Sequence, residues 1–334
     1  MCMESRLDSL WYRKSPLSLA LAPLGWLYCA AAILRRGAYR LGIAHVSRLG
    51  APVIVVGNIS VGGTGKTPLV IWIAHFLMSR GLRPGIVSRG YRGKADHWPQ
   101  QVRPDSDPIM VGDEPVLLAL ATGCPVAADP DRARAARSLL AHAECDLIVS
   151  DDGLQHLAMG RDVEIAVIDA VRRHGNGRCL PAGPLREPVS RLDSVDLVVA
   201  NGGGIGGEFH MHMSAGDAKS LTEETLSRPL ETFNAGPVHA VCGIGSPGRF
   251  FDTLEGAGLE LIRHRFPDHH AFCAADIDFD DEIPVLMTEK DAVKCRRFAD
   301  ARHWCIPVQA GLPEAFGVRL LSLLGALAPV RAKP

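Results

Sequence analysis

The sequence predicts an α/β protein whose core is a parallel sheet covered by helices. Several short runs of Val, Ile, Leu and Ala are apolar at consecutive positions, which is typical of strands buried on both faces. Segments with apolar residues at helical spacing lie between them, so strands and helices alternate. The predicted strands cover residues 53–57, 84–88, 125–128, 146–150, 164–169 and 196–200. The predicted helices cover residues 67–79, 114–122 and 132–143.

The composition fits a globular protein with more than one domain. The chain has 334 residues, 47% of them hydrophobic and 22% charged, which is enough for a sizeable core. Its formal net charge is −1, so no overall basic character points to nucleic acid. The nine cysteines are scattered and include no C-x-x-C pair. This pattern argues against a disulfide framework or a zinc site and favours a reducing compartment.

The N-terminal region, residues 1–45, is predicted to associate with a membrane. The segment 15–34 carries no charge, and it is flanked by Arg6, Arg13, Lys14, Arg35, Arg36, Arg40 and Arg48. It is at the lower length limit for a membrane span and contains Pro23 and Gly25. We expect a helix, broken near Pro23, that lies in the membrane interface with its arginines at the lipid head groups. A cleaved signal peptide, a spanning helix and a buried core helix are the alternatives.

A glycine-rich loop follows the first predicted strand and opens a helix. Ser60-Val-Gly-Gly-Thr-Gly-Lys-Thr67 matches G-x-x-x-x-G-K-[ST], except that Ser60 replaces the first glycine. The N–H groups of such a loop and the helix N-terminus bind phosphate. Lys66 would reach the β- and γ-phosphates, and the Thr67 hydroxyl would contact Mg²⁺. A phosphate-loop (P-loop) NTPase-like fold is therefore predicted. The expected nucleotide site comprises Ser60, Val61, Gly62, Gly63, Thr64, Gly65, Lys66 and Thr67.

Carboxylates follow other predicted strands, at the edge where ligands bind in such sheets. Asp151 and Asp152 end an apolar strand, and Asp151 is the better candidate for Mg²⁺. A turn that happens to begin with two aspartates is the alternative. Asp113 opens a predicted helix, so it could either cap that helix or face the site as a base. Arg89 and Tyr91 could bind an anionic, sugar-like partner or belong to a solvated loop.

The second half of the chain is predicted to be a smaller α/β domain. Residues 46–200 would form the kinase core, 201–236 a hairpin linker and 237–334 the C-terminal domain. The glycines of 202–207 formally match G-x-G-x-x-G, but the alternating residues after them predict a strand, with His210 and His212 on one face. Further elements are expected at 238–241, 249–255, 283–287 and 312–327.

The motifs taken together resemble one family, the tetraacyldisaccharide 4′-kinases (lipid A 4′-kinases). They occur in the family's order between about Pro16 and Pro307, and the family pattern shares the departure at Ser60. The motifs are Val56-Gly-Asn-Ile-Ser-Val-Gly-Gly-Thr-Gly-Lys-Thr-Pro68, Ser88-Arg-Gly-Tyr91, Gly112-Asp-Glu-Pro115, Asp151-Asp-Gly-Leu-Gln-His156, Leu180-Pro-Ala-Gly-Pro-Leu-Arg-Glu187, Asp268-His269 and Thr288-Glu-Lys-Asp-Ala-Val-Lys294.

The resemblance implies ATP- and Mg²⁺-dependent phosphorylation of the 4′-hydroxyl of tetraacyldisaccharide 1-phosphate, giving lipid IVA. It implies that Asp113 is the catalytic carboxylate, assisted by His269 across two domains, and that Asp151 and Glu114 lie near Mg²⁺. The implied site-lining residues are Arg89, Tyr91, Asp152, His156, Arg186 and Glu187. The family is peripheral on the cytoplasmic face of the bacterial inner membrane. No nucleic acid and no obligate protein partner are expected.

Two other classes of protein remain as alternatives. A phosphate-loop GTPase or metallochaperone-type switch should carry Asn-Lys-x-Asp. The nearest stretch, Thr288-Glu-Lys-Asp291, has Thr288 and Glu289 in place of the Asn and the Lys. A membrane adaptor without catalytic activity would be expected to lose its site carboxylates, whereas Asp113, Asp151 and Asp152 are all present.

Overall fold

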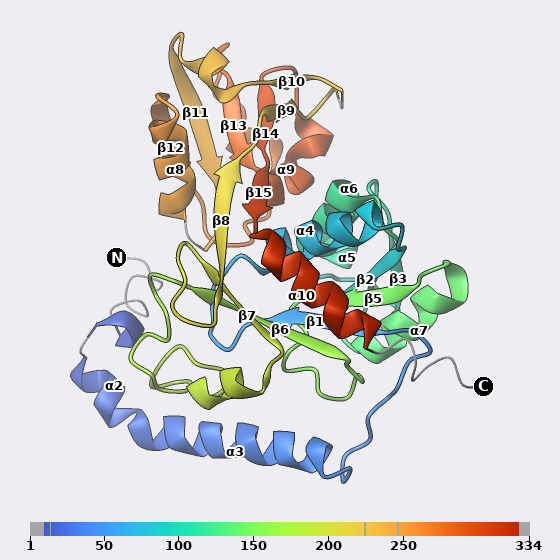
Figure 1. Cartoon of the computed structure of the whole chain (residues 1–334). Helices are drawn as coiled ribbons and strands as arrows, with labels where there is room; N and C mark the ends of the chain where they lie inside the picture. Colours follow the sequence, from blue (N-terminus) through green and yellow to red (C-terminus); the bar gives the residue numbers. More distant parts are fainter. Residues whose placement is uncertain (1–9, 14, 224, 246, 327–334) are drawn as a thin grey trace.

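The strands form two sheets. A computed structural model describes residues 10–13, 15–223, 225–245 and 247–326. Within these residues, one sheet has nine strands in the order β15-β8-β7-β6-β1-β5-β2-β4-β3, and the other has six in the order β10-β9-β14-β13-β11-β12. Figure 1 shows the second sheet above the first, with β8 and β15 running between them. The predicted α/β class with a large, mainly parallel sheet is confirmed.

The centre of the first sheet is parallel and fully buried. Its middle strand, β1 (Val53–Gly57), pairs with β5 on one side and with β6 on the other. The strands around it are β2 (Pro84–Ser88), β4 (Val126–Ala128), β5 (Leu147–Ser150), β6 (Val163–Asp169) and β7 (Leu197–Asn201). The main helices are α4 (Lys66–Ser79), α6 (Asp113–Thr122) and α7 (Arg132–His142). These elements lie where the sequence predicts them, because their apolar residues are consecutive in the strands and helically spaced in the helices.

The edges of the first sheet hold elements that the local pattern does not predict. The short elements β3 (Gln100–Val102) and α5 (Pro108–Val111) lie at one edge, with β3 antiparallel to β4. At the other edge, β8 (Phe209–Ala215) follows the glycine run as a strand, as predicted, and pairs with β15 (Val308–Gly311). The last described helix, α10 (Glu314–Gly325), buries Phe316 and Leu320 in the core of the first sheet.

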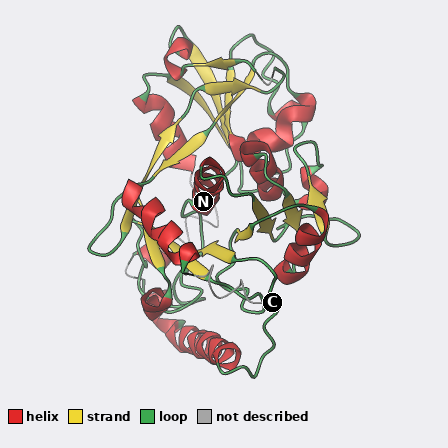
Figure 2. Ribbon diagram, turned by 45° about the vertical axis from the view of Figure 1, so that its right-hand side comes forward, coloured by secondary structure: helices red, strands yellow, loops and turns green. Residues whose placement is uncertain are grey.

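The predicted domain boundaries stay a prediction. The C-terminal part of the chain contributes to both sheets. The chain returns through β15 and α10 from the second sheet to the first (Figure 1). Figure 2 shows the two sheets in a second view. Phe316 of α10 explains this return. Its ring packs against Trp72 and Phe209, which belong to the core of the first sheet. The tail helix was expected to reach Leu327, which lies outside the described residues.

The second sheet has a parallel centre with helices beside it. The parallel strands are β12 (Glu260–Arg265), β11 (Pro237–Cys242), β13 (Val285–Thr288) and β14 (His303–Ile306). The strands β9 (Ala218–Ser220) and β10 (Ser227–Arg228) continue it in antiparallel fashion. Its helices are α8 (Pro247–Gly256) and α9 (Glu289–Cys295). The described residues also form the 3₁₀ turns η1 (Val189–Ser194), η2 (Leu230–Phe233), η3 (Ala274–Asp276) and η4 (Arg296–Phe298).

The N-terminal helices α2 (Pro16–Ala20) and α3 (Ala22–Arg40) lie along the lower edge of the molecule in Figure 1. The break falls at Leu21, with Pro23 in the first turn of α3, close to the predicted position. Gly25 faces the body so closely that a Cβ there would lie 2.9 Å from the Cys179 carbonyl oxygen. Among the described residues, no helix is long and apolar enough to cross a membrane. Arg6 and Lys14, two of the predicted flanking charges, lie outside the described residues.

Candidate active site

The glycine-rich loop between β1 and α4 is held in shape from several sides. Gly65 has φ +95°, and a Cβ there would lie 2.6 Å from Met213 Cε and 2.9 Å from Asn201 Nδ2, so only glycine fits. The Asn201 amide donates to the Thr64 carbonyl oxygen at 3.1 Å. On the other side, the Val61 N–H donates to the Pro184 carbonyl oxygen at 2.8 Å. The loop conformation is thus fixed by β7, β8 and the segment 180–187 without any ligand.

Asp152 holds two cations at the mouth of this loop. Lys66 Nζ lies 3.5 Å from Asp152 Oδ1, and Arg186 Nη1 lies 3.2 and 3.1 Å from the two carboxylate oxygens. Burial alone would raise the pKa of Asp152. The charges of Lys66, Arg186 and Arg132 outweigh it and lower this pKa to about 2. Lys66 follows the loop after β1, and Asp152 follows β5, so their contact confirms that the ends of these two strands meet at one edge of the sheet.

Asp151 is a buried carboxylate without a matching cation. Its Oδ1 has no hydrogen-bond partner among the described residues. Burial, and then the negative charges of Glu114 and Asp152, raise the pKa of Asp151 to about 7. A divalent cation would satisfy such an oxygen, and Thr67 opens the adjacent helix α4. The described residues contain no ready group of three metal-binding side chains, but Mg²⁺ usually takes one or two carboxylates together with phosphate and water.

Asp113, the first residue of α6 beside the first sheet, meets His269, which lies in the loop after β12 of the second sheet. His269 Nδ1 lies 3.0 Å from Asp113 Oδ2, and the other carboxylate oxygen accepts the Glu114 N–H at 3.0 Å. Asp113 is the first residue of α6, so its carboxylate both contacts the first helical turn and faces the second sheet. Burial would raise the pKa of Asp113, but the hydrogen bond from His269 and the charge of Lys290 more than offset it, and this pKa lies below its ordinary value.

Lys290, at the start of α9, completes this contact. Its Nζ lies 3.1 Å from His269 Nε2, 3.4 Å from Glu114 Oε1 and 3.5 Å from Asp268 Oδ1. Burial lowers the pKa of Lys290, whereas the nearby carboxylates raise it, and the carboxylates dominate. An ammonium group can only donate, so Nε2 of His269 accepts and Nδ1–H donates to Asp113. Lys290 belongs to the motif at residues 288–294, but the sequence alone did not indicate that it lies in the site.

The remaining predicted residues occupy the same edge of the sheet with different exposure. Tyr91 is exposed, and its ring meets the His269 ring edge to face at 5.4 Å. His156 lies 3.7 Å from Asp131, and burial, with the charge of Arg132, lowers the pKa of His156 to about 4. Glu187 accepts a hydrogen bond from Gln155 at 2.7 Å.

Three further residues named from the sequence are exposed. Arg89 is exposed after β2. His210 and His212 lie on one face of β8, as predicted, and that face is exposed. The motifs did not single out Asn201, which supports the loop, or Arg132, whose guanidinium donates to the carbonyl oxygens of Asp151 and Asp152. The one local signal for Asn201 is its position at the end of a strand.

Comparison with known proteins gives one result over nearly the whole chain. The sequence model of the family "Tetraacyldisaccharide-1-P 4′-kinase" matches residues 17–325. The tetraacyldisaccharide 4′-kinase of Nitrosococcus oceani is 54% identical over 94% of this chain and 93% of its own length. That of Alkalilimnicola ehrlichii is 51% identical over 97% of this chain and 98% of its own.

A solved structure agrees with the sequence comparison. The structure of LpxK from Aquifex aeolicus in complex with ATP is similar with a TM-score of 0.79 and 27% identity, covering 92% of this chain and 99% of that chain. The predicted resemblance and the phosphate-loop fold are therefore confirmed, and nothing supports the GTPase or metallochaperone-type alternative. The chain belongs to the tetraacyldisaccharide 4′-kinase family.

Proposed function

We propose that this chain transfers the γ-phosphate of ATP to the 4′-hydroxyl of tetraacyldisaccharide 1-phosphate, giving lipid IVA in lipid A biosynthesis. Family membership over almost the full length supports the reaction. The observation that supports the residue roles is the contact of 3.0 Å between Asp113 and His269. The contact between Asp113 and His269 is close to the phosphate loop. Glu114, the next residue after Asp113, and Lys66 of the loop both act electrostatically on Asp151.

ATP would bind along residues 60–67, with Lys66 placed to neutralise charge on the transferring phosphate. Thr67 and Asp151 would hold Mg²⁺, which supplies positive charge to the β- and γ-phosphates. The unpartnered Asp151 Oδ1 supports this assignment. Glu114, the third predicted ligand, forms an ion pair with Lys290 at 3.4 Å. We therefore place Glu114 near the metal ion but not in direct contact with it.

Asp113 is proposed to accept the proton of the 4′-hydroxyl. Its lowered pKa makes it a weak base. A weak base suffices because the transition state of phosphoryl transfer is loose and the hydroxyl proton leaves late. His269 orients Asp113 through Nδ1–H, and Lys290 acts as a positioning residue because its ammonium group fixes that tautomer.

The acceptor would reach this site from the membrane. The outward face of α3 is apolar and exposed, notably at Leu27 and Leu34 (68% and 73%), which supports its placement in the interface. We propose a peripheral location on the cytoplasmic face of the inner membrane, where ATP is available. The residues proposed to line the acceptor site are Arg89, Tyr91, Asp152, His156, Arg186 and Glu187.

The test is transfer of labelled phosphate from ATP to tetraacyldisaccharide 1-phosphate in detergent micelles with Mg²⁺. We expect a labelled lipid product whose formation requires both ATP and Mg²⁺. The Lys66→Ala variant is the control for contaminating kinases. Labelled GTP replaces ATP in a parallel reaction, and a strong preference for GTP without lipid labelling would favour a GTPase switch instead.

A further inference from the structure

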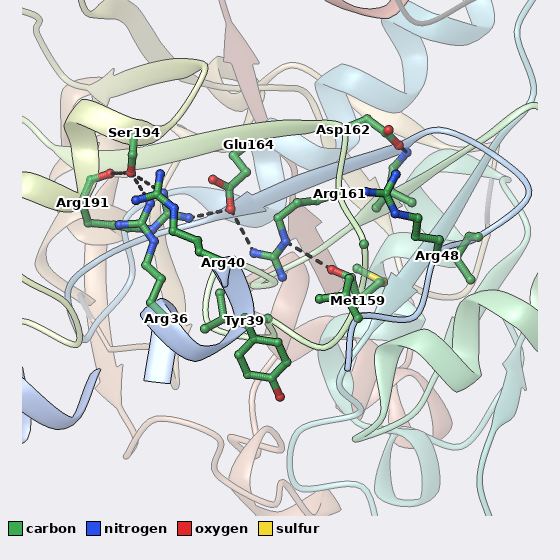
Figure 3. Close-up of a pocket in the computed structure, with 15 residues that line it drawn as sticks. Arg36, Tyr39, Arg40, Arg48, Met159, Arg161, Asp162, Glu164, Arg191 and Ser194 are labelled. Carbon is green, nitrogen blue, oxygen red and sulfur yellow. Dashed lines mark hydrogen bonds and ion pairs between the residues drawn. The ribbon is translucent and has the colours of Figure 1, made fainter. Parts of the chain in front are cut away.

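A cavity lies at the opposite end of the first sheet from the phosphate loop, and Figure 3 shows the side chains that line it. Its volume is about 390 Å³, and it lies between the C-terminal end of α3, the first residue of β1 and the start of β6. Val53 lines the cavity, whereas the phosphate loop begins after Gly57 at the other end of the same strand. At about 3.3 Å per residue, the strand separates the two sites by more than about 10 Å.

The lining of this cavity is strongly basic. It includes five arginines but two carboxylates: Arg36, Arg40, Arg48, Arg161, Arg191, Asp162 and Glu164. We term this cavity the arginine pocket. Helix α3 contributes Arg36 and Arg40 from the side that faces the protein, one turn apart.

The two carboxylates do not balance this charge. Glu164 Oε1 is shared by Arg191 at 2.5 Å and Arg161 at 2.9 Å, so it serves the deeper pair of arginines. Asp162 accepts the backbone N–H of Val53 at 2.8 Å. Arg36 donates to a neutral group, the Ser194 hydroxyl, at 2.5 Å. Burial, and then the charges of Arg191 and Arg40, lower the pKa of Arg36, so positive charge is in excess around it.

Arg40 is the most available of these cations. Its side chain is exposed, and no hydrogen bond or ion pair joins that side chain to a residue in the described part of the chain. Two large apolar side chains follow it directly, since Leu41 and Ile43 are each 78% exposed. A basic cavity beside an exposed apolar surface matches the chemistry of an amphiphile with an anionic head group.

We propose that the arginine pocket binds the phosphate of an anionic phospholipid, with Leu41 and Ile43 against its acyl region. Guanidinium groups bind phosphate oxygens through paired hydrogen bonds, and Arg36 and Arg40 approach from one helix face. A bound head group would fix the C-terminal end of α3 at the membrane, while the apolar face of the helix enters the interface. The pocket lies at the other end of β1 from the phosphate loop, and Arg191 on its inner wall is ion-paired with Glu187 at 3.3 Å.

Vesicle binding by the full chain tests this proposal. We compare flotation with vesicles of phosphatidylcholine alone and with vesicles that also contain phosphatidylglycerol, for wild type, Arg36→Gln, Arg40→Gln and the control Arg35→Gln. Arg35 lies on the same helix and carries the same charge but does not line the pocket. A surface arginine contributes about fivefold to binding of anionic membranes, so the control should lose about that much. Each pocket variant should lose more than about tenfold.

Two results would overturn the proposal. Equal losses in all three variants would mean diffuse charge attraction rather than a pocket. Thermal stabilisation by inorganic phosphate that Arg40→Gln abolishes, without any preference for phosphatidylglycerol, would mean a site for a free anion. Kinase activity in neutral detergent micelles checks that the variants fold. Because binding is measured rather than turnover, failure here leaves the proposed reaction unaffected.

Discussion

At the scale of single residues, Lys66 gives the most direct prediction. Its ammonium group lies at the mouth of the phosphate loop, where Asp152 holds it at 3.5 Å. Lys66→Ala removes the positive charge that the transferring phosphate requires, so kcat should become unmeasurable while binding of the lipid acceptor changes little. Steady-state kinetics and lipid binding check this. Turnover within about tenfold of wild type would contradict the phosphate-loop assignment.

Lys290 tests whether the tautomer of His269 matters. Lys290→Met keeps the length of the side chain but removes the donor to Nε2, so the tautomer that donates to Asp113 is no longer fixed. We expect kcat to fall by roughly tenfold or more, which is less than the roughly 10²–10⁴ for the base itself. Lys290→Arg keeps a donor at this place and should restore part of the activity.

A merely structural role for Lys290 predicts a different pattern. The melting temperature of Lys290→Met would then fall, and Lys290→Arg would regain activity only as far as it regains stability. Steady-state kinetics and thermal unfolding of both variants separate the two roles.

At the scale of secondary-structure elements, α3 has two unlike faces. Its inner face is tied to the body, because Gly25 packs on Cys179 and Ser18 in α2 donates to the Ala182 carbonyl oxygen at 2.7 Å. Deleting residues 1–40 would therefore also disturb the segment that supports the phosphate loop. Substituting Leu27→Glu and Leu34→Glu on the outer face is cleaner.

These two substitutions should weaken vesicle binding and raise KM for the lipid more than KM for ATP, since a charge in the interface opposes insertion. The melting temperature should change little, because both side chains are exposed. Val318→Glu on α10, where the side chain is 60% exposed, is the matched control. If the Leu27→Glu and Leu34→Glu variants bind vesicles as strongly as the Val318→Glu variant, the membrane contact lies elsewhere.

The pairing of β11 with β12 predicts a pH dependence of stability. His264 Nε2 faces His239 Nδ1 at 2.8 Å, His239 is bonded to Asp281, and Phe279 stacks on both rings. Burial, and then His239, lower the pKa of His264 below its ordinary 6.5. The unfolded chain then binds more protons just below that pH, so stability should fall as the pH drops below 6.5.

Melting temperatures across this range check the sign. His264→Gln should flatten the slope without abolishing it, because the pKa of His156 is lowered in the same direction. An unchanged slope in His264→Gln would exclude this pair as a source of the effect.

At the scale of the whole molecule, the local parts were predictable and the long-range parts were not. The phosphate loop could be placed between β1 and α4 because strand, glycines and helix are consecutive in the sequence. The support of that loop by Asn201 and the return of α10 to the first core depend on contacts between distant segments, which periodicity does not encode. Asp113 and His269 are 156 residues apart, and the family resemblance rather than their spacing paired them.

Asp113 lies beside the first sheet and His269 beside the second, so catalysis should depend on the contact between these two parts of the molecule. If Asp113 and His269 act as a unit, each single alanine substitution should lower kcat by about 10²–10⁴. The double variant should lose little more than the worse single variant, because residues that act together are not additive. The affinity for ATP should stay near wild type, since neither side chain belongs to the phosphate loop.

The control is a second contact between the part of the molecule around the first sheet and the part around the second sheet. Arg249 of α8 is paired with Asp169 at the end of β6, and Arg249→Ala removes this ion pair without touching the dyad. If closure alone set the rate, Arg249→Ala would reduce kcat as much as His269→Ala does; we expect a much smaller loss. Asp113→Ala also removes the acceptor of the Glu114 N–H, a hydrogen bond worth about 1 kcal/mol of stability. Melting temperatures therefore accompany the kinetics. A stable, active Asp113→Ala would rule out the base, and losses that multiply in the double variant would rule out the coupled pair.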